Sequence, residues 1–117
     1  AMIIDHDSPD KYKPEYDVSI RRLTEFLAQT SAKKEAMGAA ISVIQPGETV
    51  REHINKPDVE EVFLLLDGTA TFRLDEQDHE VSAGAIGFAK VGQKHSFTNS
   101  SGNTVRLLSI WWKAVAE

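Results

Sequence analysis

The sequence contains no cysteine, which excludes disulfide bonds, thiolate metal ligands and cysteine nucleophiles. Long apolar runs are also missing, because the longest strongly apolar run spans residues 62–66 and is far too short to cross a bilayer. Basic residues are outnumbered: 13 Lys and Arg stand against 18 Asp and Glu, for a net charge of −5. This balance disfavours nucleic acids and anionic membranes as partners. No cationic and apolar signal segment opens the chain, so we expect a cytoplasmic location.

Two common catalytic patterns are absent as well. No serine, histidine and aspartate arrangement can be identified, and the glycines at 84 and 87 do not introduce a helix, as a dinucleotide-binding loop requires. What remains is an ordinary globular composition, with 41% hydrophobic and 26% charged residues in a chain of 117. That length favours one domain with a single core.

Short β-rich runs follow one another from Met37 onward, separated by turn signals. The expected strands are 38–45, 59–66, 69–74, 79–82, 85–89, 95–99 and 104–113. Asp67-Gly68 is a hairpin signal, so the strands at 59–66 and 69–74 are expected to pair with each other. Strands at this spacing, without helices between them, predict an all-β fold, either an antiparallel sandwich or a barrel.

The N-terminal part of the chain differs from this pattern. Residues 3–17 are polar and contain two prolines, so we expect an extended arm that is ordered by contact with the body. Two interpretations stay open for the next segment: a short helix near 19–30, where apolar residues fall at helical spacing, or a strand at 18–23. We therefore divide the chain into an N-terminal arm, residues 1–30, and a barrel domain, residues 31–117.

Two short blocks carry residues of the types that bind metal. The first holds His53, Asn55 and Glu61, and the second holds His95. Alternate side chains of a strand face the same side, so Arg51, His53 and Asn55 share one face if the strand reaches that far. If these faces point into one barrel, two imidazoles and a carboxylate converge, a set that suits Mn, Fe, Ni, Co or Zn. Taken without a pattern, each of these residues is more often a surface residue than a ligand.

The spacing of glycines around these residues favours the metal site, because the two blocks resemble the two motifs of the cupin superfamily. The first motif, G-x5-H-x-H-x3–4-E-x6-G, is matched at Gly47, His53, Glu61 and Gly68. The second motif, G-x5-P-x-G-x2-H-x3-N, is matched at Gly84, Gly92, His95 and Asn99. The resemblance covers about residues 38–112, and it is specific for the fold rather than for a reaction.

Three departures from the motifs bear on the chemistry. Asn55 stands in the place of the second histidine, and an amide oxygen is a weak ligand for these metals. Five residues separate Asn55 from Glu61, one more than the motif allows. Lys90 replaces the proline of the second motif. The resemblance thus implies a divalent first-row metal held by His53, Glu61 and His95, with Asn55 as a doubtful fourth ligand and Glu60 as the alternative carboxylate if the register slips.

Other residues are expected to shape a ligand cavity or the turns around it. Arg51 binds a carboxylate or phosphate if it faces the cavity, and it is a surface arginine if it does not. The expected cavity wall is formed by Phe63, Phe97 and Trp111, while Trp112 must face the opposite side and needs cover. Tight turns and a loop are assigned to five structural residues: Gly47, Gly68, Gly84, Gly92 and Asn99.

The resemblance implies a small jelly-roll barrel that binds a small polar metabolite, and dimers are common in the family, so we expect a homodimer. Three functions stay open. The first is a metal-dependent enzyme with isomerase, lyase or oxygenase chemistry, in which no catalytic residue can be named. The second is a non-catalytic ligand-binding or sensor protein with a degraded metal site. The third is a structural or dimerisation module whose cavity is filled by side chains.

Overall fold

Ten strands, one 3₁₀ turn and one short α-helix make up the computed structural model, which describes residues 2–115. Residues 1, 116 and 117, the outer ends of the expected arm and barrel, lie outside that range. The elements are η1 Pro9–Lys11, β1 Lys13–Glu15, β2 Val18–Arg22, α1 Thr24–Ala28, β3 Met37–Ile44, β4 Thr49–Ile54, β5 Val59–Asp67, β6 Thr69–Leu74, β7 Gln77–Ser82, β8 Ile86–Ala89, β9 Lys94–Thr98 and β10 Val105–Lys113. No helix within residues 2–115 is long and apolar enough to cross a membrane.

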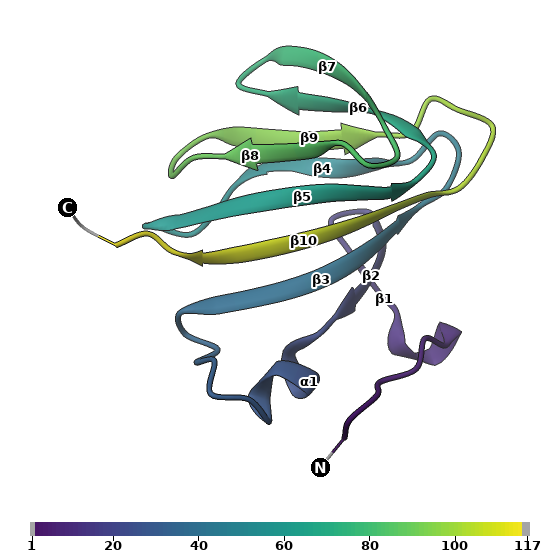
Figure 1. The fold of residues 1–117 in the computed structure, drawn as a ribbon. Helices are drawn as coiled ribbons and strands as arrows, with labels where there is room; N and C mark the ends of the chain where they lie inside the picture. The colour runs from purple at the N-terminus through teal and green to yellow at the C-terminus, as the bar shows by residue number, and fades with distance from the viewer. Residues whose placement is uncertain (1, 116–117) are drawn as a thin grey trace.

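The strands form two antiparallel sheets that pack into a barrel (Figure 1). One sheet has six strands in the order β1-β2-β3-β10-β5-β8, and the other has four in the order β4-β9-β6-β7. The long strand β10 lies at the centre of the larger sheet, paired with β3 on one side and β5 on the other. This architecture confirms the all-β antiparallel jelly roll that the sequence predicts.

Gly68 is the corner at which the chain passes from one sheet to the other. β5 belongs to the six-stranded sheet, whereas β6 pairs with β7 and β9 in the four-stranded one. The expected hairpin between residues 59–66 and 69–74 is therefore wrong. Gly68 has a φ of +90°, and an added Cβ would lie 2.9 Å from Val105 Cγ2, so a larger residue is excluded on two grounds. A positive φ is also found at Gly47, Gly84 and Gly92.

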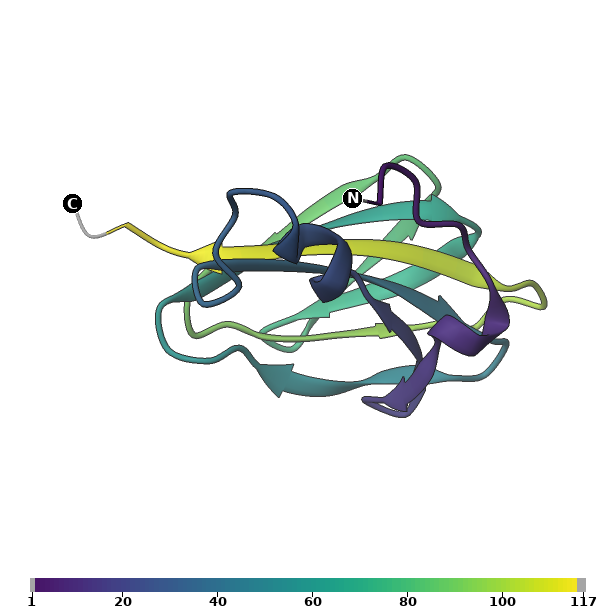
Figure 2. The same cartoon turned by 90° about the horizontal axis from the view of Figure 1, so that it is seen from below.

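The N-terminal region supplies both elements between which the sequence left a choice. β2 pairs with β3, with Ser19 opposite Val43, and α1 begins two residues after β2 ends. The polar segment before them is held by Arg21, whose buried guanidinium forms ion pairs with Asp5 at 3.0 Å and Asp7 at 3.1 Å. Figure 2 shows this segment and α1 lying against the outside of the barrel. Residues 13–22 thus extend the six-stranded sheet as β1 and β2.

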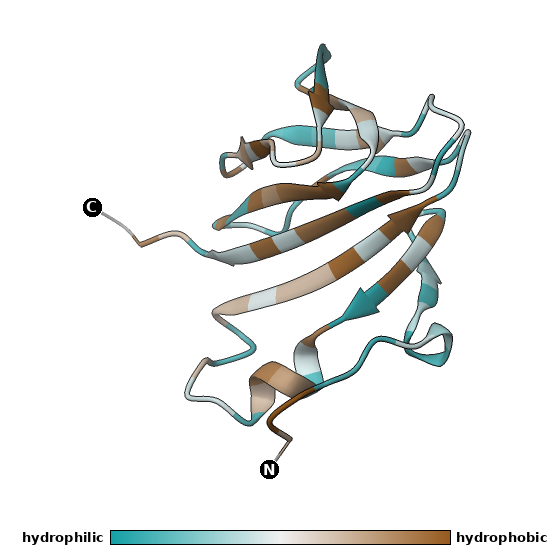
Figure 3. Ribbon diagram, turned by 45° about the vertical axis from the view of Figure 1, so that its right-hand side comes forward, coloured by the Kyte–Doolittle hydropathy of each residue, from teal (hydrophilic) through white to brown (hydrophobic). Residues whose placement is uncertain are grey.

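Hydrophobic residues are concentrated along the strands and polar residues in the connections (Figure 3). The buried core draws on both sheets and comprises Val18, Ile20, Ala40, Ile44, Val50, Phe63, Leu65, Ala70, Phe72, Ala89, Phe97, Val105 and Leu107. Asn99 is fully buried at the end of this core. Its Nδ2 donates to the carbonyl oxygens of Ile44 at 2.9 Å and Asn103 at 2.7 Å, and its Oδ1 accepts from the Ser101 backbone N–H at 2.9 Å. Asn99 therefore fastens the loop between β9 and β10 to β3.

Candidate functional site

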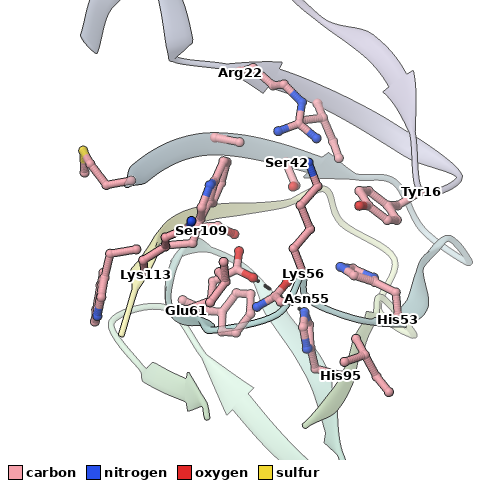
Figure 4. A pocket seen from close by; sticks show the side chains of 18 of the residues that line it. Tyr16, Arg22, Ser42, His53, Asn55, Lys56, Glu61, His95, Ser109 and Lys113 are labelled. Atoms are coloured by element: carbon pink, nitrogen blue, oxygen red, sulfur yellow. Dashed lines mark ion pairs between the residues drawn. The ribbon is translucent and has the colours of Figure 1, made fainter. Parts of the chain in front are cut away.

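A cavity of about 710 Å³ lies between the two sheets, within the size range of small-molecule sites. Its polar lining, drawn from both sheets and the N-terminal region, includes Tyr16, Arg22, Ser42, His53, Asn55, Lys56, Glu61, His95, Ser109 and Lys113 (Figure 4). Its apolar lining includes Ile20, Val50, Phe63, Phe97, Leu107 and Trp111. Polar and apolar side chains thus share the wall of the cavity, as in many ligand sites.

The two predicted histidines are brought together by the pairing of β4 with β9. His53 is directly opposite His95 in the register, and their ring centroids lie 4.5 Å apart. His95 is 2% exposed and packs against the ring of Phe63, whereas His53 is half-buried and stacks on Tyr16 at a centroid distance of 4.1 Å. The sequence therefore located both imidazoles correctly at the cavity, but it contained no signal for the stacking tyrosine.

A bulge in β4 separates Arg51 from the histidines. Between the pairs Val50–Phe97 and His53–His95, two residues of β4 lie opposite one residue of β9, so one extra residue interrupts the alternation. Arg51 is consequently exposed, with Nε 3.2 Å from Asp17 Oδ2, and it does not line the cavity. The expectation that Arg51 and His53 share a face does not hold, because strict alternation applies only where the strand is regular.

Both imidazoles have the same anchored orientation. His53 Nδ1 lies 2.7 Å from the carbonyl oxygen of Arg51, and His95 Nδ1 lies 3.2 Å from that of Gln93. A carbonyl oxygen only accepts, so each Nδ1 carries a hydrogen, and the neutral tautomer with this bond presents the lone pair of Nε2. His95 Nε2 is buried and has no hydrogen-bond partner among residues 2–115. Such a buried acceptor is suited to receive a hydrogen bond from a bound molecule.

Glu61 on β5 faces the unpaired nitrogen of His95. Its Oε1 lies 3.6 Å from His95 Nε2, an approach that Figure 4 marks with a dashed line and that is too long for a direct hydrogen bond. Burial raises the pKa of Glu61 to about 7, and the nearby side chains of Asn55 and Ser109 partly oppose the rise. Burial also lowers the pKa of His95, which favours the neutral imidazole. Glu61 therefore changes its charge near neutral pH beside a neutral histidine.

The predicted metal ligands do not all gather around one point. Among residues 2–115, no three His, Cys, Asp or Glu side chains form a group that could hold a metal ion. Glu61 and His95 converge, whereas the ring of His53 is held against Tyr16. Asn55 follows the end of β4, and its buried Nδ2 has no regular hydrogen bond within the described residues. The donor types suit a divalent metal, but this arrangement supplies two converging ligands instead of three.

The alternative carboxylate lies on the other side of the same strand. Glu60 Oε1 accepts a hydrogen bond of 2.7 Å from Trp112 Nε1. Trp111 instead turns inward, where it lines the cavity and lies so close to Gly38 that an added Cβ would meet its ring at 2.5 Å. Their adjacent positions turn the two tryptophans to opposite faces of β10, although Trp112 is also among the residues that line the cavity. Glu61 is the carboxylate that enters the cavity.

Phe63 and Phe97 line the cavity and also belong to the core. Phe72 packs beneath both of them, with ring centroids 5.5 Å from Phe63 and 4.6 Å from Phe97. The three rings form a rigid apolar floor below His95. The two roles that the sequence suggested for these residues, cavity wall and core packing, therefore coincide.

Several lining residues were missed by sequence reasoning. Ser42 and Ser109 are buried at inward positions of β3 and β10, where a small polar residue interrupts an apolar face. That interruption was a usable signal. Tyr16 reaches the cavity from the turn between β1 and β2, Arg22 from the end of β2, and Lys56 from the loop before β5. For these three, the sequence pattern held no signal, because their placement depends on how β2 adds to the sheet and how the loop closes.

Comparison with known proteins places this geometry in a family. A family profile described as a cupin domain matches residues 40–111. The chain is 21% identical to the solved plu4264 protein of Photorhabdus luminescens, at a TM-score of 0.80 with 97% of this chain and 89% of that chain covered. It is 19% identical to a Cupin 2 conserved barrel domain protein of Salinispora arenicola, at a TM-score of 0.80 with 97% and 91% covered.

A more distant solved structure is the sugar phosphate isomerase from a cupin superfamily of Silicibacter pomeroyi, 17% identical at a TM-score of 0.68, with 82% of this chain and 59% of that chain covered. No curated protein matches the sequence. These likenesses show a shared fold, and the profile spans more than half of the chain. The protein therefore belongs to the cupin domain family.

Proposed function

We propose that the protein binds a small polar molecule in its barrel cavity and exchanges a proton with it through Glu61. The observation that carries this proposal is the facing pair of Glu61 and His95, 3.6 Å apart on the wall of a cavity of about 710 Å³. A group whose pKa lies near the working pH is effective as a general acid or base, and a pKa of about 7 gives Glu61 that property. The chemistry supported is of the isomerase or lyase kind, which begins with proton removal beside a carbonyl.

The neighbours of the pair support separate roles. Glu61 takes or returns the proton, because its carboxyl is the group that changes charge near neutral pH. His95 is held through Nδ1 by the Gln93 carbonyl, so its Nε2 accepts a hydrogen bond from a ligand hydroxyl. Phe63 and Phe97 exclude water from one side of the pair, which strengthens each polar contact.

Proton exchange can be measured without knowing the physiological substrate. A panel of hydroxy acids, keto acids, sugars and sugar phosphates is incubated with the protein in D₂O, and loss of C–H signals is followed by ¹H NMR. We expect exchange in at least one compound, slowed about 100-fold or more by Glu61→Gln, because general bases contribute on that scale. Glu60→Gln makes the same change on the outer side of the strand and should leave the rate unchanged.

A compound that binds in the cavity but exchanges no proton, or exchanges equally fast in Glu61→Gln, contradicts the catalytic part of the proposal. That result supports the non-catalytic ligand-binding function instead. Filling of the cavity by side chains, as the third function requires, is opposed by its volume.

Metal binding is a second candidate function, favoured by the two free Nε2 lone pairs and the carboxylate of Glu61. Elemental analysis of protein purified without chelator tests it, and less than about a tenth of an equivalent of any first-row divalent metal, unchanged after metal addition, excludes it. Asn55→His restores the histidine of the family motif and should raise metal affinity if the site forms.

The predicted homodimer also stays a prediction, which light scattering of the purified protein tests.

A further inference from the structure

Basic side chains are concentrated around the cavity of a protein that is acidic as a whole. The chain has a net charge of −5. The lining of the cavity, by contrast, contains four basic residues, Arg22, Lys34, Lys56 and Lys113, against three acidic ones, Glu35, Asp58 and Glu61. The lining therefore has a small excess of cationic groups in an otherwise acidic protein, and this excess favours a small anion in the cavity.

The lysines among these residues are not engaged by carboxylates of the protein. Within residues 2–115, the lysines that form ion pairs are Lys11 and Lys94, both outside the cavity. Lys56 follows Asn55 in the loop between β4 and β5, and Figure 4 shows its side chain crossing the cavity toward Ser42 and Arg22. Its ammonium group is therefore available to a bound molecule.

Arg22 faces Lys56 from the opposite side of the cavity. Its Nε and Nη2 donate to the Glu15 carboxylate at 2.8 Å, which fixes the plane of the guanidinium, and the group lies 5.7 Å from the ring of Trp111. Its Nη1 donates to no residue among 2–115 in this arrangement. A guanidinium oriented in this way has a free N–H edge for a carboxylate or phosphate oxygen.

Deeper in the cavity, Asn55 provides a further donor. Its Nδ2 is buried and makes no regular hydrogen bond among the described residues, although its side chain lies near enough to Glu61 to lower the pKa of that carboxyl, so it can donate to a ligand oxygen. Ser42 and Ser109 add buried hydroxyl groups on β3 and β10. A ligand whose charged group lies near Lys56 and Arg22 would therefore place its other oxygen atoms against N–H and O–H donors deeper in the cavity.

We propose that the cavity selects small molecules with a carboxylate or phosphate group, which Lys56 and Arg22 bind, while Asn55 Nδ2 donates to another ligand oxygen. This inference rests on the proposed function, since it names the class of molecule that the same cavity binds. Arg22 and Lys56 take the role that sequence reasoning gave to Arg51, which lies outside the cavity.

Matched charged and neutral probes test the selection. Protein is treated with chelator and then dialysed, and binding of glycerol 3-phosphate against glycerol, and of succinate against succinamide, is followed by ¹⁵N NMR shifts of the residues that line the cavity. We expect each anion to bind at least about tenfold more tightly than its neutral partner. Comparing the phosphate pair with the carboxylate pair shows which of the two anionic groups the cavity prefers. Raising the salt concentration should weaken the binding of the anions and leave the binding of the neutral probes unchanged.

Charge-removing variants locate the contact. Lys56→Gln and Arg22→Gln should each lower the affinity for the preferred anion about tenfold or more. Lys90→Gln removes the same charge from an exposed lysine that does not line the cavity, and should change the affinity less than about twofold. Anion affinities that are equal in Lys56→Gln, Arg22→Gln and Lys90→Gln overturn the inference.

The outcomes separate this inference from the proposed function. If the neutral probes bind the cavity as tightly as the anions, the anion selection is wrong, whereas binding in the cavity itself stands. If no probe of either charge shifts the lining resonances, and no panel compound exchanges a proton, the proposed function fails and this inference fails with it.

Discussion

Replacing Glu61 by glutamine should make the protein more stable at alkaline pH and leave its stability nearly unchanged at acid pH. Glu61 is 7% exposed, and burial raises its pKa from 4.5 to about 7. The folded protein therefore favours the protonated carboxyl, and ionisation costs stability. Glutamine has nearly the same shape as a protonated glutamic acid but cannot ionise, so the variant avoids this cost.

The size and sign follow from proton linkage. A raised pKa means that the folded state holds the proton more tightly than the unfolded state between pH 4.5 and about 7. The stabilisation by the bound proton is complete below pH 4.5 and is lost as the pH rises through 7. The shift corresponds to about 3 kcal/mol, because one pKa unit is worth 1.36 kcal/mol. His95 acts in the opposite direction, since its lowered pKa costs stability as the pH falls below its ordinary value of 6.5.

Because these two groups oppose each other, the informative quantity is the difference between the variant and the wild type. The free energy of unfolding is measured by urea denaturation with tryptophan fluorescence at pH 4.5, 5.5, 6.5, 7.5 and 8.5, in the presence of chelator. We expect Glu61→Gln to gain about 3 kcal/mol over the wild type between the lowest and the highest pH. Glu60→Gln, on the outer side of β5, controls for the substitution itself. A difference that does not change with pH, or that changes in the other direction, refutes the reasoning.

Three further predictions concern the fold and use urea or protease as the probe. Asn99→Ala should lower the free energy of unfolding by about 3 kcal/mol, because two carbonyl oxygens and one N–H lose a buried partner; a cost below about 1 kcal/mol contradicts the role of this loop residue. Gly68→Ala should cost at least about 2 kcal/mol, and more than Gly47→Ala, since both have a positive φ but only the first meets a neighbour; equal costs refute the steric argument. Arg21→Met should speed protease cleavage within residues 2–12, and unchanged cleavage would show that the ion pairs do not hold this segment.

The residues that sequence reasoning placed well share a local cause. Glycines at fixed distances from His53, Glu61 and His95 indicated the cupin fold, because a positive φ at a barrel corner restricts the choice of residue. Because β5 is regular at these positions, the alternation of its side chains correctly predicted that Glu61 and Phe63 face the cavity. Both signals depend on a few neighbouring residues, so they can be read from one sequence.

The residues that it misplaced or missed depend on contacts between distant segments. Arg51 lies outside the cavity because β4 contains an extra residue opposite β9. Nothing in the sequence of residues 49–54 indicates that bulge. Tyr16 and Arg22 line the cavity because β2 pairs with the edge of β3. The partner of β6 was likewise decided by the other sheet and not by the turn before it.

Sequence alone therefore determined the class of fold, its corners and the position of three polar side chains at the cavity, His53, Glu61 and His95, because these rest on backbone geometry and on strand periodicity. Only the tertiary structure decided what the site is. It brought Glu61 and His95 to 3.6 Å, held His53 against Tyr16, and surrounded the cavity with Arg22 and Lys56. The physical reason is that distances, burial and the pKa of a carboxyl depend on every segment that packs around a site, whereas a sequence pattern records only the segment itself.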